Sequence, residues 1–225
     1  MRRRVIPELL DEDLGTVAEI SASLEDLRLI NERFGGTQTT VELLRCVAAK
    51  TGLRKLSGLE VAAGRGDMVM AVQRRLAAAA VELNLTLLDR MKSHLNGSGA
   101  AAVCADALRL PFRDETFDVV SCSLFAHHLE PDELQKFVVE ALRVCRHAVL
   151  INDLIRSRIH LWLVYAGLPS FRSRLTRHDA PASVRRAYTV QEMRGLLQEI
   201  PGTQVEISRH HLYRMGVLVW KAAGG

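Results

Sequence analysis

The 225-residue sequence predicts an α/β fold: a seven-stranded, mostly parallel sheet with an antiparallel last strand, preceded by a helical lid. Three observations favour this class. From residue 56 onwards, short apolar runs alternate with helical patterns, as a parallel sheet requires. One run ends in a turn that contains Gly64 and Gly66, and a long helical pattern follows at once, which is typical of a Rossmann-like sheet. The first fifty residues, in contrast, carry helical periodicity.

The segment before the sheet is expected to form two amphipathic helices. The first covers residues 14–33, and Thr16 with Glu19 forms a capping box near its start. The second begins near residue 37 and runs to residue 50. We expect residues 1–52 to act as a cap or lid over the ligand cleft. The simpler alternative is that these helices cover one edge of the sheet.

Residues 53–225 are expected to hold the sheet. Its strands are predicted near residues 57–62, 84–88, 101–105, 117–123, 147–152, 204–210 and 214–220. Helices are predicted near residues 67–81, 90–95, 131–145, 156–166 and 189–199. A substrate-side excursion is expected at about residues 154–188, with a long irregular part at 167–187 that contains Pro169 and Pro181. The last two strands are expected to close the sheet as an antiparallel hairpin.

Composition excludes several classes of protein. Hydrophobic residues make up 48% and charged residues 25%, which is ordinary for a globular domain. The four cysteines lie far apart inside apolar runs, so we expect reduced thiols in a cytoplasmic protein and neither a disulfide framework nor a zinc site. Charged residues and a proline interrupt the basic N-terminus, which argues against a signal peptide. The apolar runs are too short to span a bilayer.

The basic balance raises the question of nucleic acid. The net charge is +4, and arginines without matching acids concentrate between residues 156 and 186. Such a run could contact phosphates, but a solvated or internally paired segment is the alternative we favour. Aromatic residues make up only 5% of the chain, and no platform of interleaved aromatics for stacking bases is visible. We therefore expect no nucleic-acid partner.

The glycine turn predicts a ligand without a pyrophosphate group. Gly64 and Gly66 allow the backbone to approach a ligand closely. The third glycine of a dinucleotide fingerprint would stand three positions after Gly66, where the chain has Val69. Asp89 ends the second expected strand 23 positions after Gly66, where an acid can accept hydrogen bonds from both ribose hydroxyls.

Four segments in this order carry a family resemblance: residues 59–67 (LEVAAGRGD), 85–89 (LTLLD), 103–112 (VCADALRLPF) and 114–120 (DETFDVV). At these residues the chain resembles the class I S-adenosylmethionine-dependent methyltransferases. It looks most like the small-molecule branch that includes the ubiquinone and menaquinone C-methyltransferases. The resemblance covers roughly residues 55–150 well and the rest of the chain loosely.

The resemblance implies a set of cofactor contacts. Glu60 would bind around the methionine amine, Asp89 would hold the ribose, and Asp106 would accept the adenine amino group. Ala62 stands where the family usually has its first glycine, and Arg65 stands where Ser or Thr is more usual. We expect Arg65 to point outward and pair with solvent or a carboxylate; the alternative is that it shapes the methionine end of the pocket. The expected cofactor-binding residues are Arg33, Glu60, Ala62, Gly64, Gly66, Asp89, Arg90, Asp106, Ala107, Leu108 and Ser123. The cofactor would be S-adenosyl-L-methionine, and the product S-adenosyl-L-homocysteine.

Two adjacent histidines follow the fourth expected strand, at the edge of the sheet where ligands bind. His128, with His127 behind it, is our candidate for a general base, since imidazole titrates near neutrality. The alternative is that both histidines only pack near the cofactor. The Asn/Asp-Pro-Pro-aromatic signature of amine and nucleobase methylating enzymes is absent here, which favours transfer to oxygen or carbon of a small, aromatic or polyketide-like molecule.

The remaining expectations concern the acceptor and the competing functions. Substrate contacts are expected from Phe34, His128, Arg158, Tyr165 and Tyr188. His210 and His211 have no partner at ligand spacing, so we expect no metal. An RNA methyltransferase and a non-catalytic cofactor-binding scaffold are the alternative functions. The identity of the acceptor and the choice between monomer and homodimer stay open.

Overall fold

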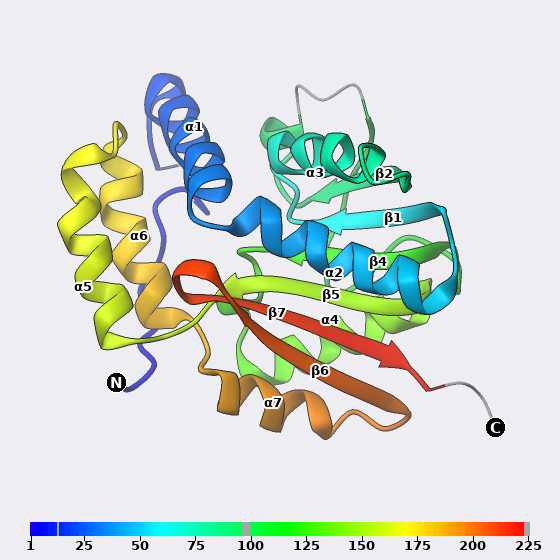
Figure 1. Ribbon diagram of the computed structural model, residues 1–225. Helices are drawn as coiled ribbons and strands as arrows, with labels where there is room; N and C mark the ends of the chain where they lie inside the picture. Colours follow the sequence, from blue (N-terminus) through cyan, green and yellow to red (C-terminus); the bar gives the residue numbers. More distant parts are fainter. Residues whose placement is uncertain (13, 96–99, 223–225) are drawn as a thin grey trace.

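The computed structural model describes residues 1–12, 14–95 and 100–222. They contain a seven-stranded sheet with the order β3-β2-β1-β4-β5-β7-β6 (Figure 1). The strands are β1 (Lys55–Val61), β2 (Glu82–Asp89), β3 (Ala101–Cys104), β4 (Phe117–Ser123), β5 (Cys145–Leu154), β6 (Thr203–His210) and β7 (Arg214–Lys221). β1 to β5 pair in parallel, and β7 is antiparallel to both β5 and β6. The predicted fold class is therefore confirmed.

Helices cover both faces of the sheet. α2 (Gly36–Thr51) and α3 (Asp67–Ala77) enclose one buried core, to which Leu44 and Leu76 contribute. α4 (Pro131–Val144) and α7 (Val190–Gln198) enclose the other, to which Phe137 and Leu197 contribute. Neighbouring strand residues alternate between the two cores, as the two-residue period of a strand requires.

Three further helices lie beyond the carboxyl ends of the parallel strands (Figure 1). These are α1 (Val17–Arg33), α5 (Arg158–Gly167) and α6 (Arg174–Arg186), and α6 packs against both α1 and α5. α1 begins after Thr16, where the expected capping box with Glu19 is present. The division of the chain at residue 52 stays a prediction; the structure adds that α2 belongs to a core of the sheet, whereas α1 does not.

Several predicted elements were wrong in detail. The helix expected at 67–81 ends at Ala77, because the chain turns at Ala80, whose φ of 56° is left-handed. The helix expected at 90–95 is only a 3₁₀ turn, Lys92–Leu95. The irregular segment expected at 167–187 contains α6, which Ser173 caps and which tolerates Pro181 in its interior. Burial of Leu175 between its neighbours outweighs the local signal of proline.

Within the described ranges, the structure contains no helix with the length and apolar character needed to cross a membrane.

Candidate active site

A cavity of about 1020 Å³ lies at the carboxyl ends of β1, β2 and β4. Its floor includes the turn after β1, the end of β2 and the loop after β4. Its other walls come from α1, α5, α6 and the N-terminal segment, residues 1–12. Ligands of open α/β sheets bind in this position.

The turn after β1 forms part of the cavity wall with its main chain. Ala62, Gly64 and Gly66 all have left-handed φ values, of 54°, 53° and 76°. A Cβ built on Gly64 would meet nothing within 4 Å, so it would project into open space on the cavity wall. The left-handed conformation of Ala62 is one that glycine adopts more readily than other residues. This turn forms a cradle in which a ligand can touch the main chain.

Asp89 is fixed beside this turn. One carboxylate oxygen accepts a hydrogen bond from the Gly64 N–H (2.9 Å), and the other accepts one from the Met91 N–H (2.9 Å). The side chain is buried at the end of β2 and lines the cavity. A carboxylate has about four lone-pair sites, so roughly two remain for a ligand. Asp89 is thus held in position to accept from a pair of hydroxyls.

Glu60 supplies a buried acid at the end of β1. Burial raises the pKa of Glu60 to about 7, and the hydroxyls of Ser121 and Ser123 offset this only in part. The Ser121 hydroxyl donates to the Glu60 carboxylate. A cation in the adjoining cavity would favour the ionised carboxylate. The site therefore suits the ammonium group of an amino-acid ligand.

Most of the other expected cofactor-binding residues line the cavity, and one does not. Arg90, Asp106, Ala107, Leu108 and Ser123 line the cavity. Arg33 is exposed at the end of α1 and is not among the lining residues. Arg65 also lines the cavity, and its guanidinium pairs with Asp67 (3.0 Å) and, more distantly, with Glu25 (3.9 Å), so both alternatives for this side chain stay predictions.

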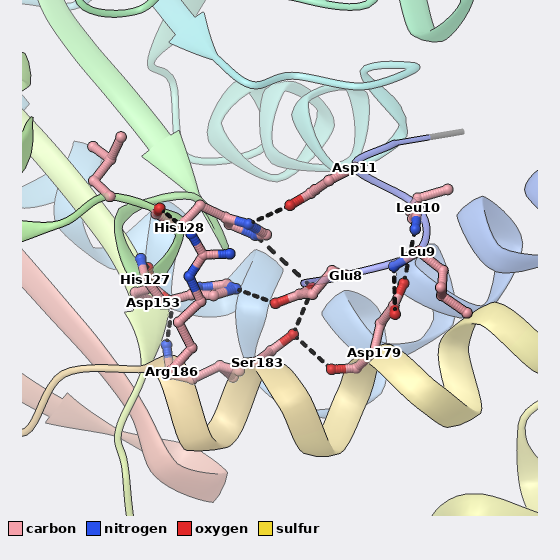
Figure 2. Close-up of polar contacts among 12 residues, drawn as sticks. Glu8, Leu9, Leu10, Asp11, His127, His128, Asp153, Asp179, Ser183 and Arg186 are labelled. Atoms are coloured by element: carbon pink, nitrogen blue, oxygen red, sulfur yellow. Dashed lines mark hydrogen bonds and ion pairs between the residues drawn. The ribbon is translucent and has the colours of Figure 1, made fainter. Parts of the chain in front are cut away.

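His127 and His128 lie in a 3₁₀ turn, Ala126–His128, directly after β4. The Nδ1 atom of His127 is 2.7 Å from Asp153 Oδ1, and its backbone N–H donates to Asp153 Oδ2. The Nδ1 atom of His128 is 2.7 Å from Asp11 Oδ2. Both imidazoles also face Glu8, with Nε2 to carboxylate distances of 3.5 Å for His127 and 4.0 Å for His128 (Figure 2). The two histidines are therefore parts of one cluster of charged side chains, which is buried at His127, Asp153 and Glu8 and half-buried at His128 and Asp11.

The N-terminal segment contributes Glu8 and Asp11 because α6 holds it in place (Figure 2). The backbone N–H groups of Leu9 and Leu10 donate to the Asp179 carboxylate (2.8 and 3.0 Å). Ser183 donates to Glu8 Oε2 (2.9 Å). Sequence reasoning missed both acids. No local signal marked them, since they lie outside any periodic element.

Charge complementarity holds this cluster together. Burial alone would lower the pKa of His127, but the nearby carboxylates of Asp153 and Glu8 raise it to about 10. Burial alone would raise the pKa of Glu8, but the two histidines lower it below its ordinary value. His127 is thus favoured as an imidazolium between two carboxylates.

Only two of the residues expected to contact the substrate line the cavity. Phe34 and His128 line the cavity, whereas Arg158, Tyr165 and Tyr188 are not among the lining residues. Tyr188 is 3% exposed and donates its hydroxyl to the Leu129 carbonyl. The Tyr165 hydroxyl accepts from Arg185. Apolar lining comes instead from residues that sequence reasoning did not select: Leu24, Leu27, Leu163, Val164 and Phe171.

Residues 59–151 match the family model described as a methyltransferase domain. This stretch begins in β1, ends in β5 and includes Glu60, the glycine turn, Asp89 and both histidines. Residues 59–151 therefore form a methyltransferase domain, and the fold of the chain is that of the class I, S-adenosylmethionine-dependent enzymes. The resemblance to the ubiquinone and menaquinone branch stays a prediction. No curated protein sequence matches this chain.

Solved structures share the fold of this methyltransferase. The plantazolicin methyltransferase BpumL, in complex with SAH, superposes with a TM-score of 0.69 at 13% identity and covers 96% of this chain and 95% of its own. A SAM-dependent methyltransferase from Aquifex aeolicus gives 0.56 at 16% identity, with 79% and 88% covered. The magnesium protoporphyrin IX methyltransferase of Synechocystis PCC 6803, with bound SAM, gives 0.53 at 11% identity, with 86% and 82% covered. At these identities the likeness establishes the fold alone.

Proposed function

We propose that this methyltransferase transfers the methyl group of S-adenosylmethionine to oxygen or carbon of a small, aromatic or polyketide-like molecule. The observation that carries the proposal is the cavity, whose two ends differ in chemistry. At about 1020 Å³ it lies at the upper end of the roughly 300–1,000 Å³ range of ligand pockets, which supports binding of a cofactor together with a small acceptor.

The cofactor end is the glycine turn with Glu60 and Asp89. S-adenosylmethionine supplies, when bound, an electrophilic methyl group on a positively charged sulfur. Asp89 would accept hydrogen bonds from the ribose hydroxyls, because its position is already fixed by two backbone N–H groups. Glu60 would pair with the ammonium group, and the open space at Gly64 leaves room for the cofactor against the main chain.

The acceptor end combines apolar side chains with the histidine cluster. Leu24, Leu27, Phe34, Leu163 and Phe171 offer an apolar surface on which an aromatic acceptor can pack. His128 and His127 remain our catalytic candidates, because both line the cavity beside Glu8. Methyl transfer depends mainly on holding the acceptor in line with the electrophilic carbon, and this enclosed wall supports such positioning.

The arginine-rich segment supports a small acceptor over RNA. Arg156 pairs with Glu192 and donates to the Ala187 carbonyl. Arg174 pairs with Glu19, and Arg186 donates to the His128 carbonyl. These guanidinium groups already have partners within the protein, which reduces their capacity to bind phosphates. The RNA hypothesis would be favoured by tight RNA binding that weakens steeply with salt.

Calorimetry and a transfer assay test this function. We expect heat on titration with S-adenosylmethionine or S-adenosylhomocysteine and none with NAD, since the turn lacks the third glycine. Transfer of a labelled methyl group is then measured against a panel of phenolic and polyketide-like acceptors. Heat with NAD alone would exclude the proposal. Cofactor binding without transfer to any acceptor class would favour the scaffold alternative.

A further inference from the structure

We propose that Glu8, His127 and His128 form a binding site for a divalent transition-metal ion, with an open position that faces the acceptor end of the cavity. The site itself is independent of methyl transfer. Its use in the reaction rests on the function proposed above. The argument depends on four features of the cluster: its geometry, its outer hydrogen bonds, its unpartnered atoms and its ligand types.

The three side chains converge on one point (Figure 2). Each offers one ligand atom, and these atoms all lie within 4.8 Å of one another. The Nε2 atom of His127 is 3.5 Å from Glu8 Oε1, and that of His128 is 4.0 Å from Glu8 Oε2. Ligand atoms about 2.0–2.2 Å from a tetrahedral zinc are roughly 3.3–3.6 Å apart. The three ligand atoms are up to 4.8 Å apart, so the side chains would have to move together by about an ångström to close around an ion.

Each proposed ligand also contacts a second polar group that orients it. Asp153 engages Nδ1 of His127 and Asp11 engages Nδ1 of His128, both at 2.7 Å. Histidines that bind metals almost always use their second ring nitrogen in this way, since the bond sets the tautomer and the direction of the ring. Ser183 donates to Glu8 Oε2 and orients the third ligand. The Nε2 atoms of both histidines and Oε1 of Glu8 are the atoms that point toward the shared centre.

Two of these atoms are buried without a hydrogen-bond partner: Glu8 Oε1 and His127 Nε2. Their side chains are only 8% and 2% exposed. The two atoms face each other as an ion pair at 3.5 Å with no hydrogen bond assigned between them, so each keeps bonding capacity toward the shared centre. A metal ion bound between them would displace the proton of the His127 ring and give both atoms a partner.

The ligand types indicate the class of metal. Two imidazoles and one carboxylate suit Zn²⁺ and its first-row neighbours, whereas Mg²⁺ and Ca²⁺ prefer oxygen ligands alone. Three protein ligands leave at least one position open, as in catalytic sites. The sequence expectation of no metal considered His210 and His211; the proposed site uses the other histidine pair and an acid 119 positions before His127.

An acceptor hydroxyl bound at the open position would become more acidic, because a metal ion lowers the pKa of the oxygen that it binds. The hydroxyl releases its proton to water, and an oxygen lone pair forms the new C–O bond. The S–CH₃ bond breaks at the same time, and its electron pair stays on sulfur. The products are a methyl ether, S-adenosylhomocysteine and one proton. The site thus favours oxygen over carbon as the atom methylated.

Metal binding is measured on the tag-free full chain after dialysis against a chelator. ZnCl₂ is titrated by calorimetry, and CoCl₂ is followed by its visible absorption, which reports coordination by nitrogen and oxygen. We expect one equivalent to bind. Glu8→Gln and His128→Ala should each weaken binding at least about 100-fold, and Asp11→Asn about 10–100-fold, as typical for an outer-sphere partner. His211→Ala, in the other and more exposed histidine pair, is the matched control and should bind as tightly as the unaltered chain.

Folding and function are separated from metal binding. Circular dichroism checks each variant, and cofactor binding is measured without metal, where it should be unchanged. Failure of the unaltered chain to bind Zn²⁺, Co²⁺, Ni²⁺, Fe²⁺ or Mn²⁺ would overturn the site, as would wild-type affinity in folded Glu8→Gln and His128→Ala variants. Metal binding without methyl transfer would leave the site standing and count against the proposed function. Transfer that survives chelation unchanged would remove the metal from the reaction.

Discussion

The two ends of the cavity are built in different ways. The proposed cofactor end consists of strand ends that follow one another in the sequence: Glu60 and the glycine turn after β1, then Asp89 at the end of β2. The proposed acceptor end combines the N-terminal segment, the turn after β4, β5 and α6. The first is fixed largely by backbone hydrogen bonds and left-handed turns, and the second by a side-chain network. A ligand group common to a family can be bound by local backbone geometry, whereas an acceptor site requires segments brought together by packing.

The strongest test of this comparison removes residues 1–12, which supply Glu8 and Asp11. We expect turnover to fall by about 10³-fold, in the range of lost proton-transfer or metal assistance, because the acceptor end loses its acids. Cofactor affinity, measured by calorimetry, should change less than roughly threefold, since residues 1–12 include none of the expected cofactor-binding residues and independent sites respond separately. Equal losses of both quantities would show that the two ends are not separable.

Glu60→Gln tests the buried acid through stability. The pKa of Glu60 is raised to about 7, so between its ordinary value near 4.5 and 7 the unfolded chain ionises while the folded chain keeps its proton. Rising pH therefore destabilises the cofactor-free protein, by about 3 kcal/mol once both states are ionised. The variant should lose this pH dependence, which is measured as Tm at pH 5 and pH 8. A parallel pH dependence in the variant would contradict the assignment, and weaker cofactor binding in the variant would support the ammonium contact.

Asp89→Ala tests the ribose contact. We expect cofactor binding to weaken by about 1–3 kcal/mol, the cost of a lost buried polar partner. Calorimetry with S-adenosylhomocysteine measures the change, and Asp132→Ala, an exposed acid at the start of α4, is the matched control. An unchanged dissociation constant in a folded Asp89→Ala variant would reject this contact.

The smallest effect is expected for Arg65→Ala. Its ion pairs with Asp67 and Glu25 involve side chains that are 28–35% exposed, and exposed pairs contribute about 0–1 kcal/mol. Stability from urea unfolding and cofactor affinity should both stay close to wild type. A loss of cofactor affinity above about tenfold would instead place Arg65 against the methionine end of the ligand and enlarge the cofactor end.

Local signals predicted the parts of the fold that depend on neighbours in sequence. The Thr16–Glu19 capping box and the glycine turn were readable because their hydrogen bonds join residues only a few positions apart. α6 was not readable, since Pro181 and the serines outweigh its helical pattern until burial of Leu175 is counted. The position of α6 also determines where the N-terminal segment lies, because Asp179 and Ser183 of this helix form hydrogen bonds with that segment.

The sequence by itself determined the α/β class, most of the strands and the candidate cofactor end, because strands, glycine turns and acids at strand ends are marked by residues close together in the chain. Only the tertiary structure decided that Glu8 and Asp11 meet His127 and His128, and that Tyr165 and Tyr188 lie outside the cavity lining. The physical reason is the separation of the contacting residues in the sequence. A contact across 119 positions leaves no periodicity in the sequence, and it exists only once the helices beyond the sheet have packed.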